Sequence, residues 1–193
     1  DNRWGSFWSV GASWRINKEK FMKDIAWIND LKFKASYGTQ GNDGLTNNQP
    51  YLDQYQVVPN GGEIGINYIF RGNKDITWEK SKNLNVGVES GFFHNRLKFE
   101  MEYFLKKTSD MLYNMPYPIS SGISYIPMNL LDMKNQGVEF TISGTPVQTA
   151  DFVWNVSFNG THYRNKIVSL PEEKRKEGII HGTSSLFRLT EGG

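Results

Sequence analysis

The chain of 193 residues contains no cysteine, so it can hold neither disulfides nor thiolate metal sites. It has no run of about 18 apolar residues, which excludes a transmembrane helix. A membrane is not thereby excluded, because the strands of a β-barrel leave a much weaker hydropathy signal. Only 38% of the residues are hydrophobic, which is low for a chain with one large core. The formal net charge of +2 argues against nucleic acid as a partner.

What the chain does contain is alternation of large apolar with polar side chains, most clearly in residues 96–107. Successive side chains of a β-strand face opposite surfaces, so this segment has one apolar and one charged face. The apolar set is Leu97, Phe99, Met101, Tyr103 and Leu105. The other face carries Lys98, Glu100, Glu102 and Lys106, with Phe104 as the one bulky exception. A transmembrane β-strand of about 9–11 residues has this pattern.

The same pattern recurs along the chain and predicts an all-β antiparallel meander. The six predicted strands are residues 4–16, 31–41, 82–93, 96–107, 136–145 and 152–166. A single short helix over residues 18–27, with Asn17 as its N-cap, is predicted between the first two strands. His94 and Asn95 predict a tight turn. Long loops are predicted for residues 42–77, 109–135 and 167–193, with a short strand at 63–70 inside the first.

Short and long connections therefore alternate, which places the short ones at one end of the sheet and the long ones at the other. Alternation alone fits a half-buried sheet of a soluble protein as well as a membrane barrel. Charges in the middle of the polar face and aromatic residues near many strand ends favour the barrel. A soluble or cell-surface carbohydrate-binding β-sheet module is the alternative.

No catalytic, cofactor-binding or metal-binding constellation is recognisable in the sequence. His94, His162 and His181 are isolated and lack the spacing of metal ligands. The glycine-rich residues 38–44 lack the Gly-Lys-Ser/Thr of a phosphate loop. We therefore expect a protein that is not an enzyme and uses no cofactor.

Glu100 and Glu102 lie two residues apart on one strand face and could be taken for an acid/base pair. The lysines Lys98 and Lys106 on the same face favour a solvated ladder of charges instead. A glycoside hydrolase would need a positioned pair of carboxylates, and the sequence offers no other candidate for one.

Tyrosines are concentrated in the predicted loops, where little core is available for them. Such residues can stack on a ligand, sugars included, although packing of loops on one another is the commoner role. The candidate ligand-binding residues are Tyr51, Tyr55, Tyr68, Tyr113, Tyr117 and Tyr125.

Several segments resemble, in the right order, the SusC/RagA family of TonB-linked (TonB-dependent) outer-membrane transporters. They are WEKSKNLNVG at residues 78–87, KTSDMLY at 107–113, NQGVEF at 135–140, LKFKASYGTQGN at 31–42 and NKIVSL at 165–170. Gln136 stands where the family usually has lysine. Each motif alone is modest, but the ordered set is specific and covers nearly the whole chain.

The resemblance implies that residues 1–193 are part of a transmembrane β-barrel domain, an arc from its C-terminal half. It places the helix-containing turn at the periplasm and the long loops at the cell exterior. It further implies an importer of oligomeric nutrients, glycans or peptides, located in the outer membrane and in contact with its lipid. The implied partners are a SusD-like lipoprotein and the TonB complex, the latter through a plug region absent from these residues.

Overall fold

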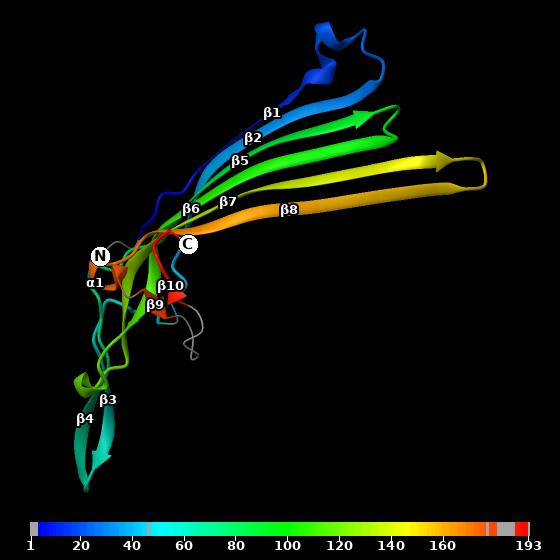
Figure 1. Ribbon diagram of the computed structural model, residues 1–193. Helices are drawn as coiled ribbons and strands as arrows, with labels where there is room; N and C mark the ends of the chain where they lie inside the picture. Colours follow the sequence, from blue (N-terminus) through cyan, green and yellow to red (C-terminus); the bar gives the residue numbers. More distant parts are fainter. Residues whose placement is uncertain (1–3, 46, 177, 181–187, 193) are drawn as a thin grey trace.

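The computed structural model describes residues 4–45, 47–176, 178–180 and 188–192, and its main element is one antiparallel sheet (Figure 1). The six strands pair in the order β1-β2-β5-β6-β7-β8. They are β1 (Ser9–Arg15), β2 (Ile28–Asn42), β5 (Glu79–Phe92), β6 (Leu97–Pro116), β7 (Tyr125–Gln148) and β8 (Val153–Ser169). In the described part of the chain β1 and β8 are the edges and do not pair with each other, so the sheet is an open arc; the β8 edge makes one isolated parallel bridge, between Ile167 and Glu191. The predicted antiparallel meander is confirmed.

The connections divide between the two ends of this sheet (Figure 1). The links β1–β2, β5–β6 and β7–β8 lie at one end, here called the turn end. The β2–β5 segment, the tip of the β6–β7 hairpin and the segment after β8 lie at the opposite end, here called the loop end. This is the arrangement that the alternating short and long connections predict.

The helix predicted over residues 18–27 is present only as two 3₁₀ turns, η1 (Ile16–Lys18) and η2 (Lys20–Met22). Neither turn has a side-chain cap. The Asn17 side-chain amide instead donates a hydrogen bond of 2.8 Å to the Asn29 carbonyl, at the start of β2. The predicted cap therefore ties the connection to the sheet, and no α-helix propagates from it.

The tight turn predicted at His94 and Asn95 is confirmed. Phe93, His94 and Asn95 have φ of 54°, 61° and 62°, and the Arg96 amide donates to the Phe93 carbonyl at 3.2 Å. Three consecutive residues in the left-handed region reverse the chain sharply, which lets β5 and β6 pair up to Phe92 and Leu97.

The loop predicted over residues 109–135 is wrong for most of its length. β6 continues to Pro116 and β7 begins at Tyr125, and these two strands remain paired past the point where the pairing of β6 with β5 ends. Asp110, with φ of 56°, lies in an irregularity of the β6 ladder, and the prolines and polar residues that follow hide the strand pattern. Only the η3 turn (Ile119–Ser121) and its neighbours form the tip.

The predicted loop 42–77 contains a separate two-stranded hairpin, β3 (Gln54–Asn60) and β4 (Glu63–Phe70), which projects from the loop end (Figure 1). β4 matches the short strand predicted at 63–70. After β8 come α1 (Glu172–Arg175), β9 (Ile179–Ile180) and β10 (Arg188–Leu189), whereas the rest of the predicted loop 167–193 lies partly outside the described residues.

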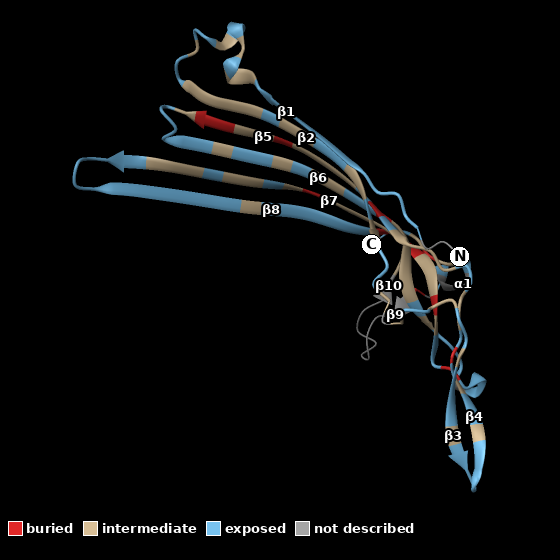
Figure 2. Ribbon diagram, turned by 180° about the vertical axis from the view of Figure 1, so that it is seen from behind, coloured by how far each residue is buried: buried red, intermediate tan, exposed pale blue. Residues whose placement is uncertain are grey.

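Burial is sparse; apart from the end of β5 at the turn end, it gathers where the sheet meets the loop end (Figure 2). A small cluster there comprises Leu131, Ile167 and Leu170, with Met111 and Tyr113 packed against it. The accessible surface of the chain is 14202 Å², whereas a compact monomer of this size would have about 9,400 Å². Among the described residues, no helix is both long and apolar enough to cross a membrane. Most apolar side chains of the sheet thus have no core to enter.

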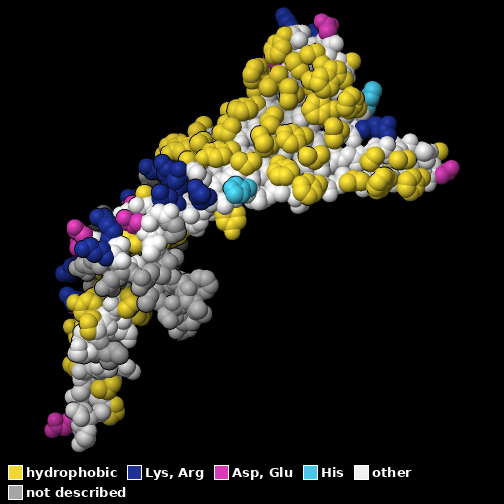
Figure 3. All heavy atoms as spheres, viewed as in Figure 1, with side chains coloured by type: hydrophobic (Ala, Val, Ile, Leu, Met, Phe, Trp, Pro, Cys, Tyr) yellow, Lys and Arg dark blue, Asp and Glu magenta, His cyan; other side chains and the backbone are white. Residues whose placement is uncertain are grey.

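Those side chains share one face of the sheet, here called the apolar face, as the register of the strands requires. One row across β2, β5, β6 and β7 runs Phe33, Val88, Met101 and Phe140. Phe140 contacts Phe158 of β8, with ring centroids 5.8 Å apart. Hydrophobic side chains cover this face almost continuously (Figure 3). The alternation seen in the sequence therefore produces one extended, solvent-exposed apolar surface.

Candidate functional site: the charged face and the loop end

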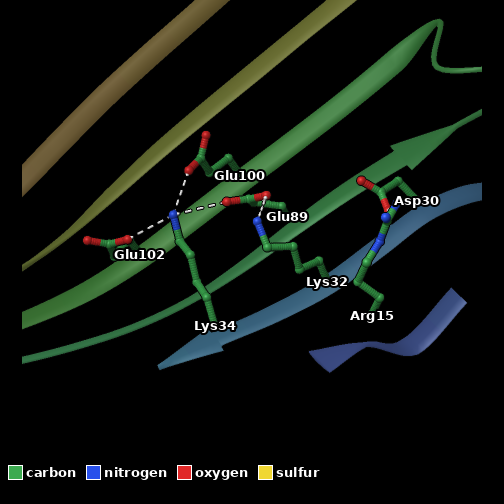
Figure 4. Close-up of polar contacts among 7 residues, drawn as sticks. All are labelled: Arg15, Asp30, Lys32, Lys34, Glu89, Glu100 and Glu102. Carbon is green, nitrogen blue, oxygen red and sulfur yellow. Dashed lines mark hydrogen bonds and ion pairs between the residues drawn. The ribbon is translucent and has the colours of Figure 1, made fainter. Parts of the chain in front are cut away.

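The opposite face of the sheet, here called the polar face, carries a network of charges centred on Lys34 (Figure 4). Its ammonium Nζ lies 2.9 Å from Glu100 Oε1, 3.0 Å from Glu102 Oε2 and 3.2 Å from Glu89 Oε1. Lys32 of the same strand reaches the other Glu89 oxygen at 2.9 Å. Two lysines thus form ion pairs with three carboxylates, and each ion pair joins two different strands.

The geometry of this network depends on a glycine. In the register, Gly87 of β5 lies between Lys34 of β2 and Glu102 of β6. A Cβ atom on Gly87 would lie 2.7 Å from Lys34 Cε and 3.1 Å from the Met101 carbonyl oxygen. The missing side chain therefore lets Lys34 cross β5 and reach two carboxylates on the next strand.

The sequence interpretation of Glu100 and Glu102 as members of a charge ladder agrees with this arrangement, but it named the wrong partners. Both carboxylates bind Lys34, two strands away, and not Lys98 or Lys106 of their own strand. Lys34 was missed because its contact spans 66 residues. The only indication in the sequence was that Lys34 lies with Lys32 and Ser36 on the polar face of an alternating strand.

The six candidate tyrosines lie at the loop end, but the structure does not bring them to one place. Tyr55 and Tyr68 are cross-strand neighbours in the β3–β4 hairpin, with ring centroids 5.0 Å apart. Tyr117 and Tyr125 flank the tip of the β6–β7 hairpin. The Arg71 guanidinium lies 5.9 Å from the centre of the Tyr117 ring, and Phe70 packs edge-on against Tyr125.

The remaining two tyrosines have different surroundings. Tyr113 packs against the cluster of Leu131, Ile167 and Leu170, and burial raises the pKa of its phenol. Tyr51 is half-buried and lines a cleft of about 270 Å³ between the β2–β5 segment and Leu112 of β6. Trp78 and Lys74 also line this cleft, so it offers an aromatic surface beside a positive charge.

The base of the β3–β4 hairpin is held by Asp53. Its Oδ1 accepts hydrogen bonds from the Gly72 amide at 2.8 Å and from the Tyr68 hydroxyl at 3.0 Å. These bonds, the Gly72 one foremost, lower the pKa of the Asp53 carboxyl. Desolvation and the bond to Asp53 raise the pKa of the Tyr68 phenol. The Tyr55–Tyr68 pair is therefore anchored by a carboxylate in its charged form.

Asn129 of β7 connects the β2–β5 segment to the β6–β7 hairpin. Its side chain accepts from the Thr77 amide at 2.8 Å and donates to the Thr77 carbonyl at 2.9 Å. The same amide nitrogen donates to the Asp110 carbonyl at 2.6 Å. The sequence gives no signal for this residue, because no local pattern distinguishes Asn129 from the other asparagines of the predicted loops.

The histidines and acidic residues do not assemble into a metal centre within the described ranges. No group of three or more potential ligands among His, Asp and Glu comes together there. His94 is in the β5–β6 turn and His162 is on β8, and His181 lies outside the described residues.

An open antiparallel sheet with one apolar and one charged face, short turns at one end and long excursions at the other, is an arc of a transmembrane β-barrel wall. The profile of the family described as TonB dependent receptor-like, beta-barrel, matches residues 1–182. The chain belongs to this family.

Individual relatives agree with the family assignment. The chain is 31% identical over 178 residues to the TonB-dependent receptor SusC of Bacteroides thetaiotaomicron, a match covering 88% of this chain and 18% of SusC. It is 33% identical over 175 residues to TonB-dependent receptor P3 of Formosa agariphila, covering 89% of this chain and 18% of that protein. The chain thus spans about a fifth of the length of these relatives.

A solved structure described as that of the RagAB peptide transporter superposes on this chain with a TM-score of 0.80 at 35% identity. The match covers 88% of this chain and 19% of that one. The similarity extends to the arrangement of the strands and confirms the predicted family and fold.

Proposed function

We propose that this chain is a wall segment of a TonB-dependent outer-membrane importer of oligomeric nutrients, glycans or peptides. The observation that carries this proposal is the apolar face. Its aromatic and aliphatic side chains are exposed over six strands, and Trp14, Trp154 and Phe158 are each at least half exposed. Such a surface is not stable in water but is matched by lipid hydrocarbon.

In this proposal the polar face lines the lumen. A water-filled lumen keeps the ion pairs of Lys34 hydrated, and strands of membrane barrels alternate apolar outside with polar inside. The turn end faces the periplasm and the loop end faces the cell exterior. Both edges of the arc, β1 and β8, pair with further strands of the complete protein, because an unpaired edge is unfavourable in a membrane.

The working partners follow from the relatives. A TonB complex would act through a plug region that these residues do not include, and a SusD-like lipoprotein would cover the loop end and deliver the ligand. The name of SusC and the description of RagAB as a peptide transporter support this assignment. The role of the chain is structural and ligand-contacting, and no catalytic residue is proposed.

The exterior tyrosines are the proposed ligand contacts, and their surroundings rank them. Tyr55, Tyr68, Tyr117 and Tyr125 present rings on projecting hairpins, and Tyr51 borders the cleft with Trp78. Aromatic faces beside Arg71 or Lys74 suit the stacking and hydrogen bonding that oligosaccharides or peptides offer. Tyr113 is the least suitable of the six because its ring packs against the apolar cluster.

The proposal is tested on the complete protein by outer-membrane fractionation and by gel mobility with and without heating. A folded barrel migrates differently from its heat-denatured form, and we expect that difference in the outer-membrane fraction. Recovery in the soluble fraction with heat-independent mobility would contradict the proposal and favour a soluble binding module. A Tyr55→Ala/Tyr68→Ala variant, compared with Tyr113→Phe, then tests ligand contact separately from assembly.

A further inference from the structure

The apolar face ends, toward the loop end, in a row of lysines. The cross-strand pairs Lys82–Lys107, Lys107–Lys134 and Lys134–Lys166 place four lysines side by side on β5, β6, β7 and β8. We call Lys82, Lys107, Lys134 and Lys166 the lysine row. No other level of the six-stranded sheet has four like charges in register.

The lysine row belongs to the apolar face and not to the polar one. Lys107 lies two residues beyond Leu105, and Lys82 lies two residues before Leu84, at positions that share a face of their strands. Lysine and arginine side chains gather at the border of the hydrophobic surface, where the sheet meets the loop end (Figure 3). In the proposed barrel this row points to the membrane and not to the lumen.

Four aligned ammonium groups are unfavourable unless an anion compensates them. Neighbouring strands are about 4.8 Å apart, and like charges directly opposite one another destabilise a sheet. In the described part of the chain none of the four makes an ion pair with a carboxylate. Two acidic residues further along β6 and β7 have other partners: Asp110 pairs with Lys80 at 3.9 Å, and Asp132 accepts a hydrogen bond from the Asp110 amide at 3.2 Å.

The position of the row matches the outer border of a membrane. Lys82 and Phe92 are ten residues apart on β5, about 34 Å along the strand, which a tilt of about 40° converts to about 26 Å of height. The apolar band of an outer-membrane barrel is about 25 Å tall. Lys82 therefore lies at the level of lipid headgroups when the turn end is at the opposite surface, and the row crosses about 9 Å of height from Lys82 to Lys166 because the strands are tilted.

The border also shifts from strand to strand as tilted strands require. Directly before β1, Trp8 lies at the level of Thr39, which pairs with Lys82, so the apolar face extends further there. On β8 the basic residues begin earlier, with Arg164 two residues before Lys166. A border that stays level in the membrane must cross successive strands of a tilted sheet at successively different registers.

We propose that the lysine row binds the phosphate groups of an anionic glycolipid in the outer leaflet. This proposal rests on the proposed membrane location. Phosphate oxygens accept hydrogen bonds from several ammonium groups at once, and the acyl chains of the same molecule would cover the apolar side chains below the row. Free phosphate would satisfy the charges but would leave that adjoining apolar surface uncovered, so the contiguity of the two surfaces favours a lipid.

The test uses the complete receptor in detergent and diphosphoryl lipid A as the probe, with bound lipid counted by native mass spectrometry. The Lys82→Gln/Lys107→Gln variant is compared with Lys98→Gln/Lys106→Gln, which removes the same charge from the polar face of β6. Each lysine of the row should contribute about fivefold to the affinity for lipid A. We therefore expect about 25-fold weaker binding for Lys82→Gln/Lys107→Gln and unchanged binding for Lys98→Gln/Lys106→Gln. Chemically dephosphorylated lipid A should bind weakly to all forms.

Equally weakened lipid binding in both double variants would overturn the proposal for the lysine row. An unchanged affinity in Lys82→Gln/Lys107→Gln would overturn it too. Competition by inorganic phosphate at the concentration of the lipid would also overturn it, because the site would then take a free anion. Heat-dependent gel mobility is measured on the same samples. If the receptor shows heat-dependent mobility but the lipid test fails, only the proposal for the lysine row is contradicted. If the heat-dependent mobility is absent, the proposed membrane location is contradicted as well.

Discussion

The six-stranded sheet and the loop end differ in where their side chains find partners. In the sheet the strands are joined by backbone ladders and by the Lys34 network, and many large side chains of the apolar face, such as Phe33, Met101 and Phe158, remain exposed. At the loop end a small buried cluster around Leu131 and side-chain clamps such as Asn129 hold irregular segments together. The comparison indicates that the sheet needs a surrounding medium and that the loop end supplies its own interior.

The strongest test of that difference places a charge on the apolar face. A Phe140→Lys substitution in the complete receptor should cost about 2–4 kcal/mol of stability, because the ammonium group would lie in hydrocarbon near the middle of the bilayer. Urea-induced unfolding in lipid bilayers measures the loss.

Thr141→Lys is the matched control, since it puts the same charge one residue away on the polar face, opposite Glu100. Its effect should be within about 0.5 kcal/mol. If both substitutions were equally costly, the two faces would not be in different media and the barrel interpretation would be wrong.

At the loop end the corresponding test removes a clamp. Asn129→Leu leaves the Thr77 amide, the Thr77 carbonyl and the Asp110 carbonyl without their side-chain partner. Each such group costs about 1–3 kcal/mol when water cannot replace the bond. Hydrogen exchange should therefore speed up at the Thr77 amide while the sheet amides stay protected.

Asn114→Leu provides the comparison for this experiment, because Asn114 is exposed on the same hairpin and, among the described residues, its side chain makes no hydrogen bond to the β2–β5 segment. Faster exchange throughout β5 and β6 in the Asn129 variant would mean that the loop end and the sheet unfold as one unit.

The same division explains what could be predicted from the sequence. The strands of the sheet were recognisable because successive residues such as Met101 and Glu102 lie on opposite faces and differ in polarity, and the turn at Asn95 has a local signature. The paired extension of β6 and β7 was missed because Asp110 interrupts the ladder and Pro116 and Pro127 resemble loop residues.

The sites depended on contacts that no local pattern contains. Lys34 meets Glu100 only because Gly87 leaves space on the strand between them, and Asn129 meets Thr77 across 52 residues. The tyrosines were recognisable as loop aromatics, but their distribution over separate hairpins required the fold. The lysine row was visible in the sequence as single residues, and only the register aligns them.

A smaller effect is expected for the polar face. Lys34→Met should cost about 1–2 kcal/mol, since its three carboxylate partners are 31–51% exposed and each such pair contributes about 0.2–1 kcal/mol. The loss should shrink at high salt, which screens the pairs in the wild type. Lys106, on the same face, makes no ion pair with any described residue, so Lys106→Met should leave stability unchanged. An equal loss there would contradict a specific network.

The smallest effect, and the most local, concerns the Asp53 anchor of the β3–β4 hairpin. Because its pKa is lowered in the folded state, the anchor contributes fully above the ordinary carboxyl pKa and is lost as the pH falls through the lowered value. Hydrogen exchange at the Gly72 amide, corrected for its intrinsic pH dependence, should show protection at pH 7 that declines below about pH 4. Asp53→Asn keeps an uncharged Oδ1 that accepts the Gly72 hydrogen bond, so protection in this variant should be weaker at pH 7 and should no longer decline at low pH. A pH-dependent loss that persists in this variant would assign the titration to another group and leave the hairpin without its proposed anchor.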